Sequence, residues 1–248
     1  MCGVGAAATA HTPAASGEGR GHALMSQCAL IAREANVCDA DPAAELLLCS
    51  PRNINADMDD DAADDWAAQV EAQREAKIQQ FRESARSPLP VAMRGDAFPG
   101  LAYFDPDPAF RYVIPLHEHD EKETVTVETT ADGEQTYRRW GKFRFEVDGE
   151  STTIQAYRPA DGADRFWVPF RDATSGDETY GAGRYLDLEP DRDRVDDEWV
   201  VDFNHSYNPT CAYNHAYECP LVPTENWLDV AIEAGERDFP AEPAGADH

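Results

Sequence analysis

The chain has 248 residues, with 48 acidic side chains against 21 basic ones, which leaves a formal net charge of −27 at pH 7. It contains no run as long as the roughly 18 apolar residues that a membrane-spanning helix needs. A surface so rich in carboxylates repels phosphate groups, so we expect neither nucleic acid nor a membrane surface as a partner.

Aromatic residues divide the chain into two parts of different composition. All 24 of them lie after residue 57. A segment without large aromatic side chains has little surface to bury, and burial offsets the entropy that a chain loses on folding. We therefore predict a disordered leader over residues 1–57, a mis-assigned extension ahead of a natural translation start at Met58. We expect a single β-rich domain over residues 58–237 and a frayed C-terminal tail over residues 238–248.

The charged residues predict adaptation to high salt. Residues 58–248 contain 42 acidic and 18 basic residues, and the acids are spread along the chain. Of the 21 basic residues in the whole sequence, 18 are Arg. We interpret this as a halophilic composition, because the screening length falls to about 3 Å in molar salt and repulsion among carboxylates then weakens. We also expect a cytoplasmic protein, since no basic segment precedes an apolar stretch of the length that a secretory signal needs.

The first predicted element is an amphipathic helix over residues 66–86. Its apolar residues lie near helical spacing: Trp66, Val70, Ile78 and Phe81. The rest of the segment is rich in Ala, Glu, Gln and Arg, which favour a helix. Asp64 or Asp65 can cap its start. Ser87 marks its end, because the residue before a proline disfavours the helical conformation.

Farther along the chain the apolar pattern changes to period two, which is typical of half-buried strands. Asp132-Gly133 and Asp148-Gly149 predict tight hairpin turns, so the early strands form an antiparallel meander. The predicted strands cover residues 110–116, 124–130, 135–140, 143–147, 151–157, 166–170, 184–188, 199–203 and 228–232. With about eight strands and one N-terminal helix, the fold class is mainly β, an antiparallel sandwich or barrel.

A glycine-rich segment over residues 168–188 is the first candidate for chemistry. Its glycines allow close backbone approach to a ligand, and we take Glu178, Tyr180 and Arg184 as candidate ligand-binding residues. The spacing of the glycines is not that of a P-loop, because the completing Lys and Ser/Thr are missing. The alternative is a turn-rich connection whose hydroxyl groups cap their own backbone.

A long irregular segment over residues 202–227 is the second candidate, and loops of this length are usually functional or disordered. A zinc site would use four borderline-soft ligands: His205, Cys211, His215 and Cys219. In a thiol enzyme Cys211 would be the nucleophile, with either histidine as the base and Asp202 or Glu225 orienting that base. A disulfide between the two cysteines would need an oxidising compartment. Two buried, inert thiols are the remaining alternative.

Three charged residues allow two interpretations. Arg184, Asp202 and Glu225 could form the floor of a charged pocket, or they could form ion pairs that hold the long loop against the sheet. His117 and His119 lie on one face of a predicted strand and could bind a metal, although an exposed strand edge explains them equally well.

Several motifs carry a resemblance to a known family. They are SPLP at 87–90, GLAYFDPDPAF at 100–110, WGKFRFEVDG at 140–149, the FWVPF…RYLDL stretch at 166–188, and DFN…AGE at 202–236. The sequence resembles the family known as domain of unknown function 1684, found in archaea and bacteria. The family pattern maps onto Asp202, Asn204, Asn208, Cys211, Tyr213, Cys219, Glu178, Tyr180 and Arg184. His205 and His215 lie outside that pattern, and Val222 and Trp227 replace its usual proline and arginine.

The resemblance implies no established activity. We expect the two candidate segments to meet at one end of the sheet and form a polar pocket for a small molecule, with hydrolysis as the candidate reaction. Asn204, Asn208 and Tyr213 complete the expected ligand-binding set. The alternative is a non-catalytic binding or interaction module in which the long loop is a structural latch. The sequence specifies neither a cofactor nor an oligomeric state.

Overall fold

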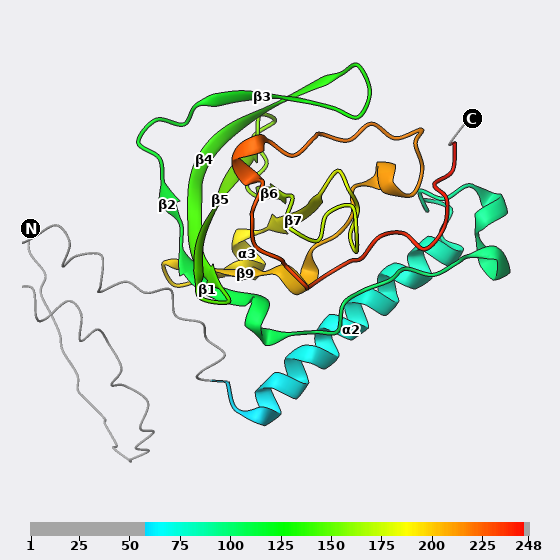
Figure 1. Ribbon diagram of the computed structural model, residues 1–248, viewed down its shortest axis with the longest axis horizontal. Helices are drawn as coiled ribbons and strands as arrows, with labels where there is room; N and C mark the ends of the chain where they lie inside the picture. Colours follow the sequence, from blue (N-terminus) through cyan, green and yellow to red (C-terminus); the bar gives the residue numbers. More distant parts are fainter. Residues whose placement is uncertain (1–57, 246–248) are drawn as a thin grey trace, which may run out of the picture. The chain divides into compact units, whose positions relative to one another are not determined.

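The structure, a computed structural model, describes residues 58–245 (Figure 1). The predicted leader and the last three residues lie outside this range, so the predictions of disorder before residue 58 and of a start at Met58 stay predictions. None of the described helices is long and apolar enough to cross a membrane.

Helix α2 (Asp60–Glu83) is the long N-terminal helix that the sequence predicts, but it begins earlier than expected. The Asp59 side chain caps it by accepting a hydrogen bond from the Ala62 backbone N–H at 2.9 Å. Asp60 and Asp61 then occupy the first turn, where carboxylates interact favourably with the helix dipole. The predicted caps Asp64 and Asp65 are therefore wrong. At the other end the backbone leaves the helix at Ser84.

The remaining architecture is mainly antiparallel β, as predicted. The described residues form nine strands: β1 (Arg111–Pro115), β2 (His117–Glu118), β3 (Thr124–Glu128), β4 (Glu134–Val147), β5 (Glu150–Pro159), β6 (Phe166–Phe170), β7 (Arg184–Leu188), β8 (Arg194–Val195) and β9 (Glu198–Asp202). A three-stranded sheet has the order β1-β9-β8, and a six-stranded sheet has the order β2-β4-β5-β6-β7 with β3 also paired to β4. No closed barrel forms in the described part of the chain, so of the two predicted forms the barrel is wrong.

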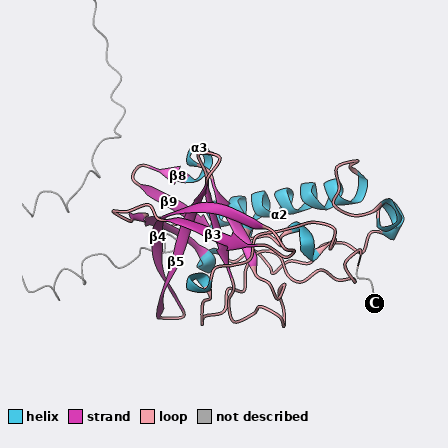
Figure 2. Cartoon of the chain, turned by 90° about the horizontal axis from the view of Figure 1, so that it is seen from above, coloured by secondary structure: helices cyan, strands magenta, loops and turns pink. Residues whose placement is uncertain are grey.

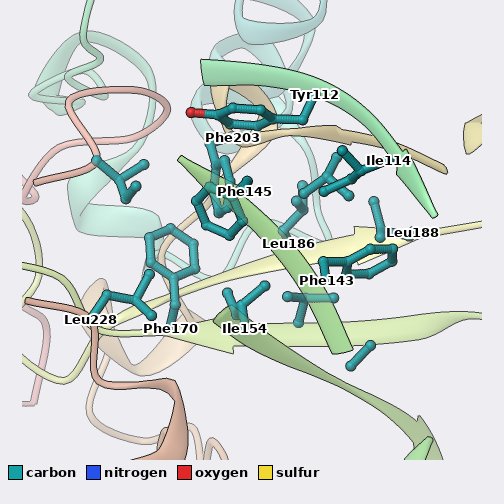
Figure 3. Close-up of a cluster of buried hydrophobic side chains, with 14 of the residues drawn as sticks. Tyr112, Ile114, Phe143, Phe145, Ile154, Phe170, Leu186, Leu188, Phe203 and Leu228 are labelled. Atoms are coloured by element: carbon teal, nitrogen blue, oxygen red, sulfur yellow. The ribbon is translucent and has the colours of Figure 1, made fainter. Parts of the chain in front are cut away.

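The main hydrophobic core takes side chains from both sheets. Figure 3 shows Tyr112 and Ile114 of β1 beside Phe143 and Phe145 of β4, with Phe203 just beyond β9 among them. The rings of Phe145 and Phe203 lie 5.2 Å apart between centroids. Burial of these aromatic side chains is the chief source of stability for this part of the fold.

A smaller aromatic cluster covers the opposite face of the six-stranded sheet. It is formed by Val127, Tyr137, Tyr157, Trp167, Tyr185 and Val222. Strand β4 serves both clusters because its register shifts between Arg139 and Gly141, and an extra residue in a strand changes the face on which later side chains lie. Tyr137 therefore packs on one face and Phe143 on the other.

The two predicted hairpin turns differ. Asp148 and Gly149 both have positive φ angles, 52° and 81°, and form the tight two-residue turn between β4 and β5, as expected for this dipeptide. Between β3 and β4 the connection is longer, and a hydrogen bond from the Thr129 N–H to the Gly133 carbonyl closes it at 3.0 Å. The tight turn predicted at Asp132-Gly133 is therefore wrong, although the hairpin exists.

The last predicted strand, residues 228–232, is also wrong. The segment is extended and its backbone bonds to residues 171–173, with the Leu228 N–H donating to the Arg171 carbonyl at 2.8 Å and the Ala173 N–H to the Val230 carbonyl at 3.0 Å. Leu228, Val230 and Ile232 are buried in the main core. Their alternation was thus a correct signal of burial, but the neighbouring segment is irregular and no ladder forms.

The C-terminal residues up to 245 pack instead of fraying. Phe239 is 8% exposed and its ring lies 5.4 Å from that of Tyr213. The Ala244 N–H donates to the Tyr213 carbonyl at 3.0 Å. These contacts belong to a third cluster, in which Phe81 of helix α2 also packs. The expected frayed tail, residues 238–248, is therefore not observed over its described part.

Candidate functional site

The glycine-rich segment and the 202–227 segment lie against each other. Tyr185 and Tyr207 exchange two backbone hydrogen bonds of 2.9 Å, and the Tyr180 hydroxyl lies 3.8 Å from Cys211 Sγ. Gly183, with φ of 98°, permits the approach, because a Cβ there would lie 2.5 Å from the Phe170 carbonyl oxygen and 2.6 Å from Val222. Figure 2 shows that the long loops gather on the side of helix α2.

Arg184 is fully buried and holds the C-terminal segment in place. Its guanidinium donates to the carbonyl oxygens of Ile232, at 2.8 Å, and Glu236, at 3.2 Å, and also to that of Ala234. Asp172 faces it at 3.4 Å. Burial lowers the pKa of Arg184, and the nearby Asp172 carboxylate opposes that shift. These contacts favour the ion-pair interpretation of Arg184 over a role in ligand binding.

Asp202 and Asn204 connect helix α2 to the end of strand β9. The Trp66 indole N–H donates to Asp202 Oδ2 at 2.9 Å. Asp202 Oδ1 accepts from the Asn204 backbone N–H at 3.0 Å. The Asn204 amide then bonds both the N–H and the carbonyl of Asp107, each at 2.8 Å. Both side chains are buried, and their polar atoms are used in holding the fold together.

Asn208 and Tyr213 converge on Glu236, a buried carboxylate that we did not single out from the sequence. Glu236 is 1% exposed. It accepts from the Tyr213 hydroxyl at 2.6 Å, the Asn208 N–H at 3.0 Å and Lys77 Nζ at 2.6 Å. Burial, together with the Glu236 carboxylate, raises the pKa of Tyr213. Asp172 and Lys77 were missed as well, because nothing in the sequence distinguishes these charges from exposed ones.

The two cysteines form a pair of free, buried thiols. The Cys211 backbone N–H donates to Cys219 Sγ at 3.3 Å. The pKa of Cys211 is lowered to about 6, chiefly by a hydrogen bond from the Cys219 thiol, with further bonds from Tyr180 and Thr130. The pKa of Cys219 is raised by its bond to Cys211 and by burial.

The four expected zinc ligands are not brought together. His205 lies 3.7 Å from Asp202, and burial lowers its pKa, whereas His215 is exposed. Neither histidine is among the hydrogen-bond partners of Cys211 within residues 58–245. No group of three or more His, Cys, Asp or Glu side chains in that range is placed to hold a metal ion. This also applies to His117 and His119, the latter bonded to Gln155 at 2.8 Å.

A hollow of about 510 Å³ lies beside β3 and the end of the long loop. Its lining consists of Val125, Thr126, Val127, Glu128, Arg171, Ala182, Leu221, Val222, Pro223, Thr224, Glu225 and Trp227. Asn226 fixes this part of the loop beside β5 (Figure 1), because its amide bonds the backbone N–H and carbonyl of Gln155 at 2.7 and 3.0 Å. Both candidate segments thus contribute to one concave surface.

Glu225 is the one predicted catalytic residue in this hollow. Its Oε1 accepts a hydrogen bond from the Tyr157 hydroxyl at 2.8 Å and lies 3.4 Å from the Arg139 guanidinium. Burial and the Glu225 carboxylate raise the pKa of Tyr157, so its hydroxyl stays protonated and keeps donating. Trp227 is 52% exposed, and the Arg171 guanidinium lies 4.5 Å from the centre of its ring.

Comparison with known proteins places the chain in a family. The family described as "Protein of unknown function (DUF1684)" matches residues 96–237, more than half of the sequence. The chain belongs to this family. The resemblance in the sequence motifs is therefore confirmed, and helix α2 precedes the matched region.

One solved structure is similar to the chain over most of that structure's length. The solution NMR structure of an uncharacterized protein from the haloarchaeon Haloarcula marismortui shares 44% sequence identity with this chain, with a TM-score of 0.55. The match covers 72% of this chain and 97% of that one. Among curated proteins, none matches the sequence.

Proposed function

We propose that the protein binds a small, planar aromatic molecule carrying an amino or amidine group in the hollow beside β3. The single observation that supports this most is a concave surface of about 510 Å³ with mainly apolar walls and few polar groups. Such a combination is the usual form of a small-molecule site.

The walls favour a flat, apolar ligand. Val125 and Val127 of β3 line the hollow together with Leu221, Val222 and Pro223 of the long loop. Trp227 is one of only four large hydrophobic residues that are exposed within residues 58–245, and the planar Arg171 guanidinium already lies over its ring. An aromatic ligand can take part in the same stacking, because π faces pair favourably with rings and guanidinium planes.

Glu225 favours a hydrogen-bond donor on that ligand. Both contacts of its carboxylate in the described residues go to Oε1, which leaves Oε2 to accept from a ligand. Glu128 adds a second negative charge to the lining, against the single positive charge of Arg171. A cationic nitrogen therefore matches the hollow better than an anion of the same shape.

We propose binding without hydrolysis. The predicted nucleophile Cys211 does not line the hollow, so a ligand bound there lies apart from the Cys211 sulfur. We likewise propose a small molecule as partner in place of nucleic acid or a membrane surface, given the net charge of −27. Two free thiols support a reducing compartment such as the cytoplasm.

Benzamidine and benzoate test this proposal, because the two probes share a ring and carry opposite charges. Each is titrated into ¹⁵N-labelled protein in molar KCl, and amide shifts are followed by NMR. We expect benzamidine to shift the signals of residues 125–128 and 221–227 with saturation, and benzoate to bind at least about tenfold more weakly. Equal responses to both probes, or shifts outside these residues, would contradict the proposal.

A matched pair of variants assigns the charge effect to Glu225. Glu225→Gln should weaken benzamidine binding about tenfold, since it removes a charge-assisted hydrogen bond. Glu233→Gln removes the same charge from an exposed position that does not line the hollow, and it should leave binding unchanged. If both variants weaken binding equally, the preference arises from overall charge and not from this site.

A further inference from the structure

Two thiols lie together where the long loop folds back on itself. Cys211 lies in a 3-10 turn, Thr210–Ala212, and Cys219 lies just before Pro220. The contact between the Cys211 N–H and Cys219 Sγ brings the two residues to hydrogen-bonding distance. Neither lines the hollow assigned to ligand binding, so the pair is a separate feature.

The loop between the thiols is already fixed. The Tyr213 hydroxyl is bonded to Glu236, and the Asn214 amide donates to the Pro88 carbonyl at 2.8 Å. On the other side, the Cys219 N–H donates to the Thr130 hydroxyl at 3.1 Å. A bond between the two sulfur atoms would therefore join positions that the fold holds close, with little loss of further chain entropy.

The surroundings distinguish the two thiols chemically. Tyr180, which is half-buried, lies 3.8 Å from Cys211 Sγ. Hydrogen bonds from Cys219 and Tyr180 lower the pKa of Cys211, whereas the pKa of Cys219 is raised. These opposite shifts favour the thiolate form at Cys211 and the thiol form at Cys219. A thiolate is the reactive form of cysteine, and a neighbouring thiol can resolve its oxidised product.

We propose that Cys211 and Cys219 are a peroxide-sensitive dithiol site that closes to a disulfide. The Cys211 thiolate attacks one oxygen of hydrogen peroxide and the O–O bond breaks, giving a sulfenic acid and hydroxide. The Cys219 sulfur then displaces the sulfenic oxygen, forming the S–S bond and releasing water, while its own proton goes to the leaving hydroxide. The hydroxide of the first step takes up the proton that the Cys211 thiol lost when it ionised, so in sum two thiols are oxidised and one peroxide is reduced to two water molecules.

The second step is favoured by the first. The pKa of Cys219 is raised chiefly by its hydrogen bond to Cys211. A sulfenic acid carries no charge at that position, so oxidation of Cys211 removes this effect and makes the Cys219 thiol easier to ionise. The order of events, attack by Cys211 and resolution by Cys219, follows from this asymmetry.

The sequence provides a clean readout. Residues 195–237 contain no Lys or Arg before Arg237, so trypsin leaves both cysteines in one peptide, apart from the other four. The full chain is treated with equimolar hydrogen peroxide in molar KCl, and the remaining thiols are blocked with iodoacetamide. The masses of the tryptic peptides are then measured by mass spectrometry. We expect the mass of this peptide to be lower than that of the dithiol form by two hydrogen atoms, with no group added by iodoacetamide. Treatment with a reductant should restore the mass of the dithiol form.

Single substitutions test the assigned roles. In Cys219→Ser, Cys211 should accumulate as a sulfenic acid that dimedone traps. In Cys211→Ser, the remaining thiol should be oxidised at least about tenfold more slowly, because even without its bond to Cys211 an ordinary thiol, with a pKa of about 8.5, is mostly protonated at neutral pH. Tyr180→Phe should slow disulfide formation. Tyr217 is an exposed tyrosine between the two cysteines, and Tyr217→Phe should leave the rate of disulfide formation unchanged.

The wild-type measurement decides the proposal even if a variant fails to fold. A peptide that remains a dithiol after peroxide treatment would overturn it. So would a peptide carrying sulfinic or sulfonic acid without a disulfide, or one joined to any of the other four cysteines. These outcomes are independent of benzamidine binding, so failure of either proposal leaves the other standing.

Discussion

Arg184 shows how one buried charge can organise the end of the chain. Its guanidinium donates to the backbone carbonyls of three alternate residues of the C-terminal segment, 232, 234 and 236, and faces Asp172. Asp172 also accepts from the Ile232 N–H at 2.7 Å and from the Thr174 hydroxyl at 2.9 Å. A cation without its counter-charge is far more costly in the interior than the intact pair.

Asp172→Ala should therefore lower the free energy of unfolding by about 3–5 kcal/mol, because it leaves Arg184 buried without a counter-charge. Urea denaturation in molar KCl measures this. Asp177→Ala, at an exposed position in the same segment, is the control and should change stability by less than about 0.5 kcal/mol. Equal stability of the two variants would show that the Arg184 contacts do not hold the fold.

Cys211 should ionise well below the usual range for cysteine. The groups that face it are Cys219, Tyr180, Thr130 and Tyr185. Since its pKa is lowered from 9.0 to about 6, the thiolate predominates above that pH and is lost as the pH falls through it. The iodoacetamide alkylation rate at Cys211, read from the peptide 195–237, should rise with pH to a plateau, with a midpoint near 6.

Tyr180→Phe should move that midpoint to higher pH, because the phenol no longer donates to the thiolate. A wild-type midpoint close to the ordinary value for cysteine would show that the described hydrogen bonds do not stabilise the thiolate. Cys219 serves as the internal comparison in the same peptide, and it should react slowly over the whole range.

At the scale of elements, the start of helix α2 shows where local rules compete. The sequence Asp59–Asp65 contains five aspartates, and any of them could cap a helix. The structure uses Asp59, the first of them, so that Asp60 and Asp61 lie in the first turn. The longer helix then places Trp66 within reach of Asp202.

Asp59→Ala should lower the free energy of unfolding by about 1 kcal/mol, since it removes the side chain that accepts from the Ala62 N–H. Asp65→Ala changes an exposed aspartate inside the helix and should cost less than about 0.5 kcal/mol. Thermal unfolding followed by circular dichroism in molar KCl compares the two. The opposite ranking would restore Asp65 as the cap.

Periodicity predicted most of the elements, because it reports burial directly. Phe143, Phe145 and Val147 were correctly placed on the core face of a strand. The same signal misassigned residues 228–232, since burial alternates in any extended segment whether or not a partner strand is present. The bulge in β4 was not predicted, because one extra residue leaves no mark in composition.

The candidate site was less predictable than the fold. The sequence placed the glycine-rich and 202–227 segments in one region, and Tyr180 does meet Cys211. It did not separate Glu225, which lines the hollow, from Asp202, which binds the Trp66 indole. Both are carboxylates in one loop, and only the folded chain decides which remains open. Trp227 was the residue of the hollow that the sequence did mark as unusual, because the family pattern has an arginine at that position.

At the scale of the whole molecule, charge should govern stability. The net charge is −27, and the solved relative comes from a haloarchaeon. Self-repulsion among carboxylates opposes the compact state, and salt screens it. We expect the melting temperature to rise between low and molar KCl, measured by calorimetry. An unchanged or lower melting temperature in molar KCl would show that the acidic surface does not require salt.

The six-stranded sheet carries the main core on one face and the smaller aromatic cluster on the other, and the register shift in β4 lets one strand contribute to both. Val127 and Val222 of the smaller cluster also line the hollow. During evolution, replacements on this side can accumulate without repacking the aromatic interior across the sheet. Relatives can thus diverge in what they recognise while inheriting the same scaffold.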